Sequence, residues 1–180
     1  WIVAFLKDDG PLEYFTFETA SEEAKFLFTN LAALEGQPLV KMEPVVIEAR
    51  DGLKLVSYLS RPANADGPVP LVLNVHGGPW ARDAWGYDPS HQWHANRGYA
   101  VLSVNFRAST GFGKTFGNAG DMQWGRAMHD DLLDAVAWAV EQGIADPDKV
   151  AIAGGSYGGY ATLWGMTNKP EVFACGVDIV

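Results

Sequence analysis

Hydrophobic and polar positions alternate over the first part of the chain. Residues 1–6 and 12–18 both alternate and flank a polar turn at 7–11, which is the pattern of a β-hairpin. Residues 21–34 fit either a capped helix or a further strand, and the run Phe26-Leu27-Phe28 favours the strand. The start of the chain is therefore predicted to be a short antiparallel meander, the unit from which β-propeller blades are built.

From residue 45 the hydrophobic pattern changes to strands that alternate with helices. A second hairpin is predicted at 45–49 and 53–59, around the turn Asp51-Gly52. Further strands are predicted at 70–75, 99–104, 150–153 and 173–180, helices at 91–97, 128–142 and 160–166, and a turn at 146–148. This alternation predicts an α/β fold with a mostly parallel sheet and helices on both of its faces.

The segment from Val150 to Tyr160 has the pattern of a nucleophile elbow. An apolar strand runs into Gly154-Gly155-Ser156-Tyr157-Gly158 and a helix-compatible run follows, so G-x-S-x-G stands between a strand and a helix. Glycines are needed two residues before and after the serine, because a Cβ there would collide with neighbouring elements. We predict that Ser156 is a catalytic nucleophile; the alternative is a glycine-rich structural turn.

A second motif follows the apolar strand at 70–75. His76-Gly77-Gly78-Pro79 places two glycines where hydrolases of this architecture keep an oxyanion donor, and bare backbone there can approach a substrate carbonyl. The N–H groups of Gly78 and Tyr157 are the predicted pair of donors. His76 is predicted to orient the loop rather than to act as the base, because the triad of such hydrolases runs serine, acid, histidine along the chain.

No histidine follows Ser156. The last residues contain two carboxylates, Glu171 in a surface-type loop and Asp178 in a strand-type run, so the general base is not expected on this chain. The chain starts without methionine in an apolar run and ends in another, which predicts a fragment of a longer protein. No targeting segment can be judged from such a start.

His76, Trp80 and Arg107 are weaker candidates, for a substrate pocket. Trp80 follows the second motif, and buried packing is the alternative for it. Arg107 ends a predicted strand and either orients substrate or braces a loop through its fork of donors. His91 and His94 have helical spacing for two metal ligands, but no third ligand is evident, so a solvated helix face is predicted and no metal.

Composition narrows the class of protein. The chain has 180 residues, 48% of them apolar and 19% charged, which is ordinary globular material for one domain and a piece of another. Its net charge of −9 argues against a nucleic-acid partner, and its apolar runs are too short to span a membrane. The lone Cys175 excludes an internal disulfide and is predicted to be buried. The protein is predicted to be soluble, and no cofactor is expected. The sequence does not decide between cytoplasm and periplasm, or between a monomer and a homo-oligomer.

Three motifs together resemble the prolyl oligopeptidase family of serine peptidases, in its acylaminoacyl-peptidase and dipeptidyl-peptidase-like branch. They are His76-Gly-Gly-Pro79, Asn105-Phe-Arg-Ala-Ser-Thr-Gly-Phe-Gly113 and Gly154-Gly-Ser-Tyr-Gly-Gly159. The resemblance implies that residues 1–44 end a β-propeller and lead into a linker, and that 45–180 begin an α/β-hydrolase domain. It implies oligopeptide substrates, Ser156 as nucleophile, Tyr157 and Gly78 as oxyanion donors, and an acid and histidine beyond Val180.

Two other functions fit the same residues. A carboxylesterase or lipase of the α/β-hydrolase fold would use the same elbow, although the blade-like start and the HGGP motif favour the peptidase. A non-catalytic fragment is the second alternative, since the chain lacks its base. Residue preference at the scissile bond and the choice between endo- and exopeptidase are not predicted.

Overall fold

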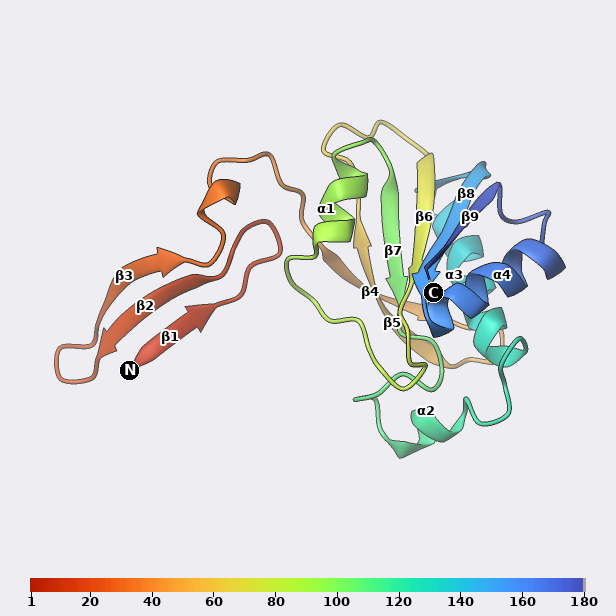
Figure 1. Cartoon of the computed structure of the whole chain (residues 1–180), viewed down its shortest axis with the longest axis horizontal. Helices are drawn as coiled ribbons and strands as arrows, with labels where there is room; N and C mark the ends of the chain where they lie inside the picture. The colour runs from red at the N-terminus through yellow and green to blue at the C-terminus, as the bar shows by residue number, and fades with distance from the viewer. Residues whose placement is uncertain (180) are drawn as a thin grey trace.

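The computed structural model describes residues 1–179, which form two separate sheets (Figure 1). The first sheet is antiparallel, with strand order β1-β2-β3. It consists of β1 (Ile2–Phe5), β2 (Glu13–Glu18) and β3 (Glu23–Thr29), followed by a 3₁₀ turn, η1 (Ala32–Leu34). Aromatic pairs cross the strands, such as Tyr14 stacked on Phe28 at 4.8 Å between ring centroids. The predicted hairpin and third strand are confirmed; their assignment to a propeller stays a prediction.

The second sheet has six strands in the order β4-β5-β7-β6-β8-β9. These are β4 (Glu43–Glu48), β5 (Lys54–Ser60), β6 (Val69–Val75), β7 (Ala100–Val104), β8 (Ala145–Gly155) and β9 (Cys175–Ile179). The pairs β4–β5 and β5–β7 are antiparallel and the others are parallel. Because β6, β7 and β8 run the same way, the loops after them leave from one edge of the sheet. Val180, the last residue of the predicted final strand, lies outside the described residues.

Helices cover both faces of this sheet, as predicted (Figure 1). The covering helices are α1 (Pro89–Ala95), α3 (Ala127–Glu141) and α4 (Tyr157–Asn168), whereas the short α2 (Lys114–Asn118) lies beyond the carboxyl ends of the strands. Side chains of a strand alternate between faces. On β7, Ser103 hydrogen-bonds His91 of α1, whereas Leu102 belongs to the core cluster shared with α3 and α4. The short α2 has no counterpart in the sequence predictions.

The main core lies between the sheet and α3. Fully buried leucines of β6 and β7 meet Met128, Leu132 and Ala135 on the inner face of α3. This face is the one that the spacing of Leu132, Val136 and Ala139 predicts. Each fully buried leucine contributes roughly 2 kcal/mol relative to an exposed one. The core thus holds the parallel strands in place, and with them the loops at their carboxyl ends.

The predicted turn at 146–148 is not a boundary between α3 and the next strand. It lies inside β8, where the partner of Val69 is Ala145 and the partner of Leu71 is already Val150. The Asp146 carboxylate accepts a hydrogen bond from the Asp148 N–H at 3.0 Å, which is an Asx turn. Residues 146–148 therefore do form a turn, as predicted, but this turn interrupts β8 and the same strand continues after it.

Two residues differ in burial from the sequence predictions. His91 is buried rather than on a solvated helix face: its Nδ1 and Nε2 each lie 3.0 Å from a serine hydroxyl, those of Ser60 and Ser103. Cys175 is exposed rather than buried. It begins β9, the edge strand of the described sheet, which pairs with β8 alone. Apolar neighbours in sequence indicate burial only when another element covers the strand.

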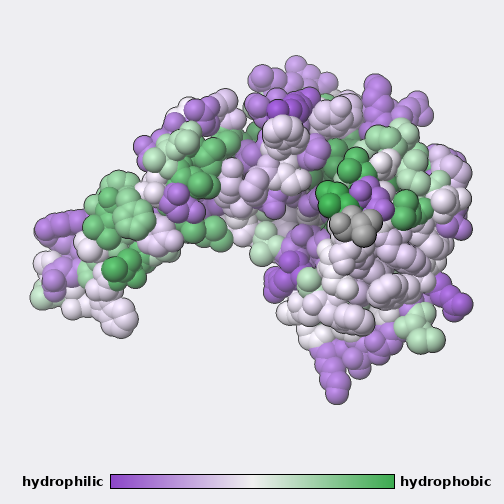
Figure 2. Space-filling model, viewed as in Figure 1, coloured by the Kyte–Doolittle hydropathy of each residue, from purple (hydrophilic) through white to green (hydrophobic). Residues whose placement is uncertain are grey.

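The turn after β1 connects the two sheets. Asp8 is buried and its carboxylate accepts a hydrogen bond from the Met42 N–H at 2.8 Å. The Gln92 amide of α1 donates to the carbonyls of Asp8 and Val40. Figure 2 shows hydrophobic side chains on the surface of the first sheet, where Phe26, Phe28 and their neighbours are exposed. No helix among residues 1–179 combines the length and apolarity that crossing a bilayer requires.

His129 makes the stability of the fold dependent on pH. It is 2% exposed on α3, packs against Trp164 at 4.3 Å between rings, and its Nε2 has no hydrogen-bond partner among the described residues. Burial, with a smaller effect of the Lys169 charge, lowers the pKa of His129 from 6.5 to about 4. The neutral ring is therefore favoured in the fold. Its stabilisation is complete above pH 6.5 and is lost as the pH falls toward 4.

The free energy of unfolding of the wild type falls as the pH drops from 6.5 to 4. We predict that His129→Leu in the full-length protein makes this fall smaller, by on the order of 3 kcal/mol at most. Urea denaturation at a series of pH values measures this loss. The half-buried His94 of α1 gives the control, since His94→Gln should retain most of the wild-type dependence. An unchanged pH dependence in His129→Leu would contradict the assignment.

Candidate active site

Ser156 stands at the turn between β8 and α4 in a backbone conformation that side chains rarely adopt. Its φ is 55° and its ψ is −117°, and its side chain is exposed at the carboxyl edge of the sheet. A non-glycine residue held there carries backbone strain of about 1–3 kcal/mol. Backbone bonds keep the turn closed, since the Ser156 N–H donates to Ile179 O and its carbonyl accepts from the Tyr160 N–H, both at 3.0 Å.

The glycines around Ser156 allow the backbones of β8, α4 and β6 to pack closely together. A Cβ on Gly154 would lie 2.5 Å from the Val75 carbonyl oxygen, and one on Gly158 would overlap the same oxygen. Val75 is the last residue of β6, so the elbow is pressed against the strand that carries the second motif. A Cβ on Gly155, by contrast, would meet nothing closer than Ile179 O at 3.4 Å. Gly154 and Gly158 are thus required by packing, and Gly155 is not.

The loop after β6 lies directly beside the serine. A Cβ on Gly77 would be 3.1 Å from Gly155 O and 3.9 Å from the Ser156 hydroxyl. Gly78 has a φ of 121°, and a Cβ there would be 2.6 Å from the Trp80 N–H nitrogen. Only glycine fits this position. The structure therefore brings the two motifs together, which is the arrangement that an oxyanion site requires.

Tyr157 begins α4, so its backbone N–H has no acceptor within the helix. The positive end of the helix dipole favours negative charge at the same place. The phenol is buried beneath, with its hydroxyl 3.9 Å from the Met128 sulfur and its ring 5.3 Å from that of Phe106. Burial raises the pKa of Tyr157, so its hydroxyl stays protonated. Of the polar groups of Tyr157, the backbone N–H at the start of α4 is the one without a partner among the described residues.

His76 fastens the loop that carries Gly77 and Gly78. Its ring stacks on Phe106 at 4.5 Å, its Nδ1 lies 2.8 Å from the Gly77 carbonyl, and its Nε2 lies 2.8 Å from the Ser109 hydroxyl. A carbonyl only accepts, so Nδ1 carries the proton and Nε2 accepts from Ser109. Burial lowers the pKa of His76, against a smaller opposite effect of the Gly77 bond. With both nitrogens engaged, His76 is a loop residue rather than a free base.

Arg107 braces the loop after β7. Its guanidinium bonds both Asp131 oxygens, at 2.9 and 2.7 Å, and lies 2.9 Å from Asp51. Burial raises the pKa of the Asp131 carboxyl and the bonds from Arg107 oppose this effect. Occupied in this way and 7% exposed, Arg107 fits the bracing alternative better than contact with substrate. Trp80 is 65% exposed instead, beside the second motif.

Ser109 and Asp131 are the partners that sequence reasoning missed. Ser109 lies within the motif at 105–113, but nothing in the sequence indicates that it bonds His76. From sequence alone, Asp131 is grouped with His129 and Asp130 in the first turn of the helix predicted at 128–142, where acidic residues favour the helix dipole. Asp130 does occupy the first turn of α3, whereas Asp131 is fully buried against Arg107. An acidic residue on the buried face of a helix was the available signal of an ion pair.

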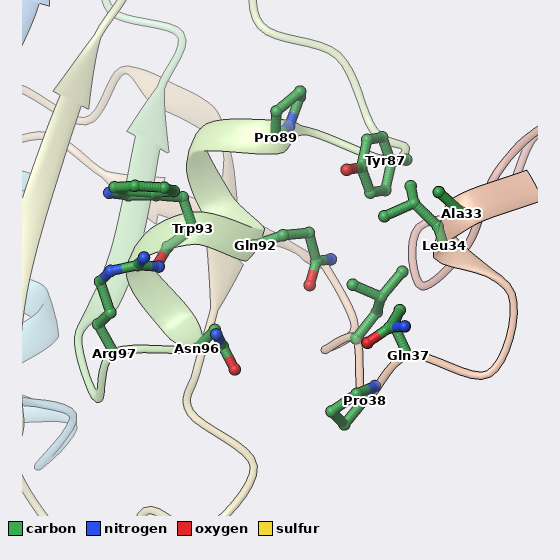
Figure 3. A pocket seen from close by; sticks show the side chains of 11 residues that line it. Ala33, Leu34, Gln37, Pro38, Tyr87, Pro89, Gln92, Trp93, Asn96 and Arg97 are labelled. Atoms are coloured by element: carbon green, nitrogen blue, oxygen red, sulfur yellow. The ribbon is translucent and has the colours of Figure 1, made fainter. Parts of the chain in front are cut away.

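One cavity lies away from these residues, between η1 and α1 (Figure 3). It has a volume of about 450 Å³, and Arg97 stacks under the Trp93 ring on one of its walls, 3.5 Å from the centroid. Gln92 on its inner side bonds both the N–H and the carbonyl of Val40. None of the candidate catalytic residues lines it. It marks the junction of the two sheets rather than the site at Ser156.

Fold and site together define an α/β protein with a serine at a strained strand–helix turn, beside a glycine loop from the neighbouring strand. The chain belongs to the prolyl oligopeptidase family, whose family model matches residues 85–180. This membership was predicted from the three motifs and is confirmed. The family consists of serine peptidases.

The chain is similar to parts of longer proteins. It is 58% identical to dipeptidyl aminopeptidase BIII of Pseudoxanthomonas mexicana, over 100% of this chain and 27% of that protein. It is 42% identical to dipeptidyl peptidase family member 6 of Caenorhabditis elegans, again over 100% of the chain and 27% of the relative. A puromycin-hydrolyzing peptidase of Mycobacterium tuberculosis has a similar structure, with a TM-score of 0.85 and 29% identity, over 98% of this chain and 28% of that one. The chain thus spans about a quarter of these proteins.

We predict that Gly158→Ala destabilises the full-length protein by about 3 kcal/mol and that Gly155→Ala has little effect. Alanine is intrinsically the better helix residue at position 158, so a loss there reports the overlap with the Val75 carbonyl. Thermal unfolding of the two variants measures the difference. Equal unfolding temperatures would show that the elbow is not held by this contact.

Proposed function

We propose that the full-length protein is a serine peptidase that hydrolyses peptide bonds of oligopeptides through an acyl-enzyme, with Ser156 as the nucleophile. The observation that carries this proposal is the strained backbone of Ser156, which is stabilised by surrounding contacts and leaves the hydroxyl exposed. Such strain is typical of functional sites. Membership of the prolyl oligopeptidase family gives the reaction class.

The reaction is acyl transfer in two steps. The Ser156 Oγ attacks the carbonyl carbon of the scissile bond while its proton passes to a base, and the carbonyl oxygen becomes an oxyanion. The tetrahedral intermediate collapses to an ester on Ser156 as the amine leaves with that proton. Water then attacks the ester, and the released acid regenerates the serine.

The N–H groups of Tyr157 and Gly78 are the proposed oxyanion donors. The Tyr157 N–H is free at the start of α4, and Gly78 sits in the loop that packs against Ser156. Each such donor lowers the barrier by about 3 kcal/mol. The lock of His76 on Ser109 and Phe106 fixes this loop before substrate arrives, which avoids reorganisation during the reaction.

The histidine and acid of the triad are proposed to lie outside residues 1–180. Among the described histidines, His76, His91 and His129 are each buried or bonded within the fold. None of these three is free to take a proton from Ser156, and the fourth histidine, His94, lies on α1 with its ring against that of Tyr99. The family resemblance supplies the expectation of a base and an acid later in the chain, and removal of the base costs several orders of magnitude in rate.

Peptide substrates follow from the family, and the finer choice among them is a proposal. Two similar proteins bear names of enzymes that release dipeptides, a dipeptidyl aminopeptidase and a dipeptidyl peptidase family member. We propose short oligopeptides as substrates on this basis. An esterase with the same elbow would instead favour short acyl esters over peptide anilides, which makes that comparison decisive between the two classes.

We predict that a fluorophosphonate probe labels the full-length protein and that Ser156→Ala abolishes both labelling and peptide hydrolysis. Phosphonylation requires the activated hydroxyl and the oxyanion donors together. Labelling is measured by mass spectrometry of the peptide that contains Ser156. Ser21→Ala, which removes an exposed hydroxyl from the turn between β2 and β3, is the matched control and should label like the wild type.

A Ser156→Ala variant that is still labelled and still hydrolyses peptides would contradict the assignment. Wild-type protein that is neither labelled nor active would favour the non-catalytic alternative.

A further inference from the structure

A cavity of about 460 Å³ opens beside the glycine loop, at the same edge of the sheet as Ser156. It lies between that loop, the segment after β7 and the region of α2, and Figure 1 shows α2 beyond this edge of the sheet. Its walls include Trp80, Ser109, Thr110, Gly111, Gly113 and Asp121. Neither the proposed reaction nor the packing of the core uses this space.

The cavity is connected to the nucleophile by contacts already described. Ser109, on the wall of the cavity, hydrogen-bonds the His76 ring. Gly77, which follows His76 in the chain, packs against Ser156. Trp80 is three residues beyond Gly77, so their Cα atoms are at most about 11 Å apart. A substrate residue within three positions of the scissile bond can therefore reach the cavity.

The walls of the cavity are fixed. The Thr110 N–H donates to the Ala81 carbonyl at 2.8 Å, which ties the residue after Trp80 to the opposite wall. The Asn105 amide bonds the Asp83 N–H and carbonyl, at 2.9 and 3.3 Å. Trp80 thus projects from a segment held at two points, and its indole is 65% exposed. An exposed tryptophan on a fixed backbone costs little entropy to bind against.

The chemistry of the cavity favours a cation. Asp121 supplies its charge, is exposed, and takes part in none of the ion pairs found among residues 1–179. The Arg82 guanidinium lies behind the cavity wall, against Gly111 and over the Phe112 ring at 4.8 Å from its centroid, and does not itself line the cavity. An indole face attracts cations, and the long stem of a basic side chain packs on apolar surface while its head group stays with a carboxylate.

We propose that this cavity is a substrate subsite that takes a lysine or arginine side chain, with the stem against Trp80 and the charge on Asp121. The inference rests on the proposed peptidase function and adds a preference for basic residues near the scissile bond. Trp80 contributes to specificity in this account, whereas Arg107 contributes through the fold alone.

The test compares fluorogenic peptides that carry lysine or norleucine, which has a similar stem without the charge, at each of three positions on either side of the scissile bond. In the full-length protein we expect lysine to raise kcat/KM about tenfold over norleucine at one position, the size of a charge pair that the bound substrate partly shields from water. Asp121→Asn should reduce that ratio to about one. Asp121→Lys should instead favour glutamate over glutamine at the same position.

Asp148→Asn is the matched control, because it removes the same charge from an exposed position on the amino-terminal part of β8. It should keep both the wild-type ratio and the wild-type rate. Equal rates for lysine and norleucine at every position, or a ratio that Asp121→Asn leaves unchanged, would overturn the subsite. In those cases hydrolysis of the norleucine peptides and labelling of Ser156 still report on the peptidase function. Absence of both would reject that function and the subsite with it.

Discussion

The close approach of the elbow to the end of β6 is the constraint on which the site depends. Two glycine positions, Gly154 and Gly158, face the Val75 carbonyl at distances that leave no room for a Cβ. This contact fixes β8 and the start of α4 against the strand that leads into the glycine loop. It thereby sets the strained backbone of Ser156 and brings the Tyr157 N–H to the same place as the loop. Neither motif would have its proposed chemistry without the other beside it.

Several layers of contacts hold this arrangement, each fixed by the next. His76 holds the glycine loop against Phe106 and Ser109, which lie in the loop after β7. Arg107 in turn holds the loop after β7 to Asp131 of α3 and to Asp51 of the β4–β5 turn. These groups are buried and bonded, so they lose little entropy when substrate binds. Exposed side chains at this edge include Ser156, Trp80 and Asp121. Packing thus separates the buried residues that brace the site from the exposed residues that are proposed to contact a substrate.

The sequence predicted what depends on local pattern. The two hairpins, the alternation of strands and helices, the face of α3 and the elbow all follow from periodicity and turn chemistry. Contacts between distant segments were not predictable: His91 is buried because serines of β5 and β7 bond its ring, and Asp131 because Arg107 reaches it. Cys175 is exposed although its sequence neighbours are apolar, because none of the described elements covers its side chain. The proposed nucleophile follows from one motif, whereas the bond from Ser109 to His76 could be found only from the fold.

The most direct measurement of the central claim is a crystal structure of the full-length protein with a phosphonate bound covalently to Ser156. The account predicts that one phosphonyl oxygen accepts hydrogen bonds from the backbone N–H groups of Tyr157 and Gly78, with Ser156 still at positive φ. An adduct whose oxygens all face solvent, or a Ser156 that relaxes to an ordinary helical or extended backbone, would contradict it.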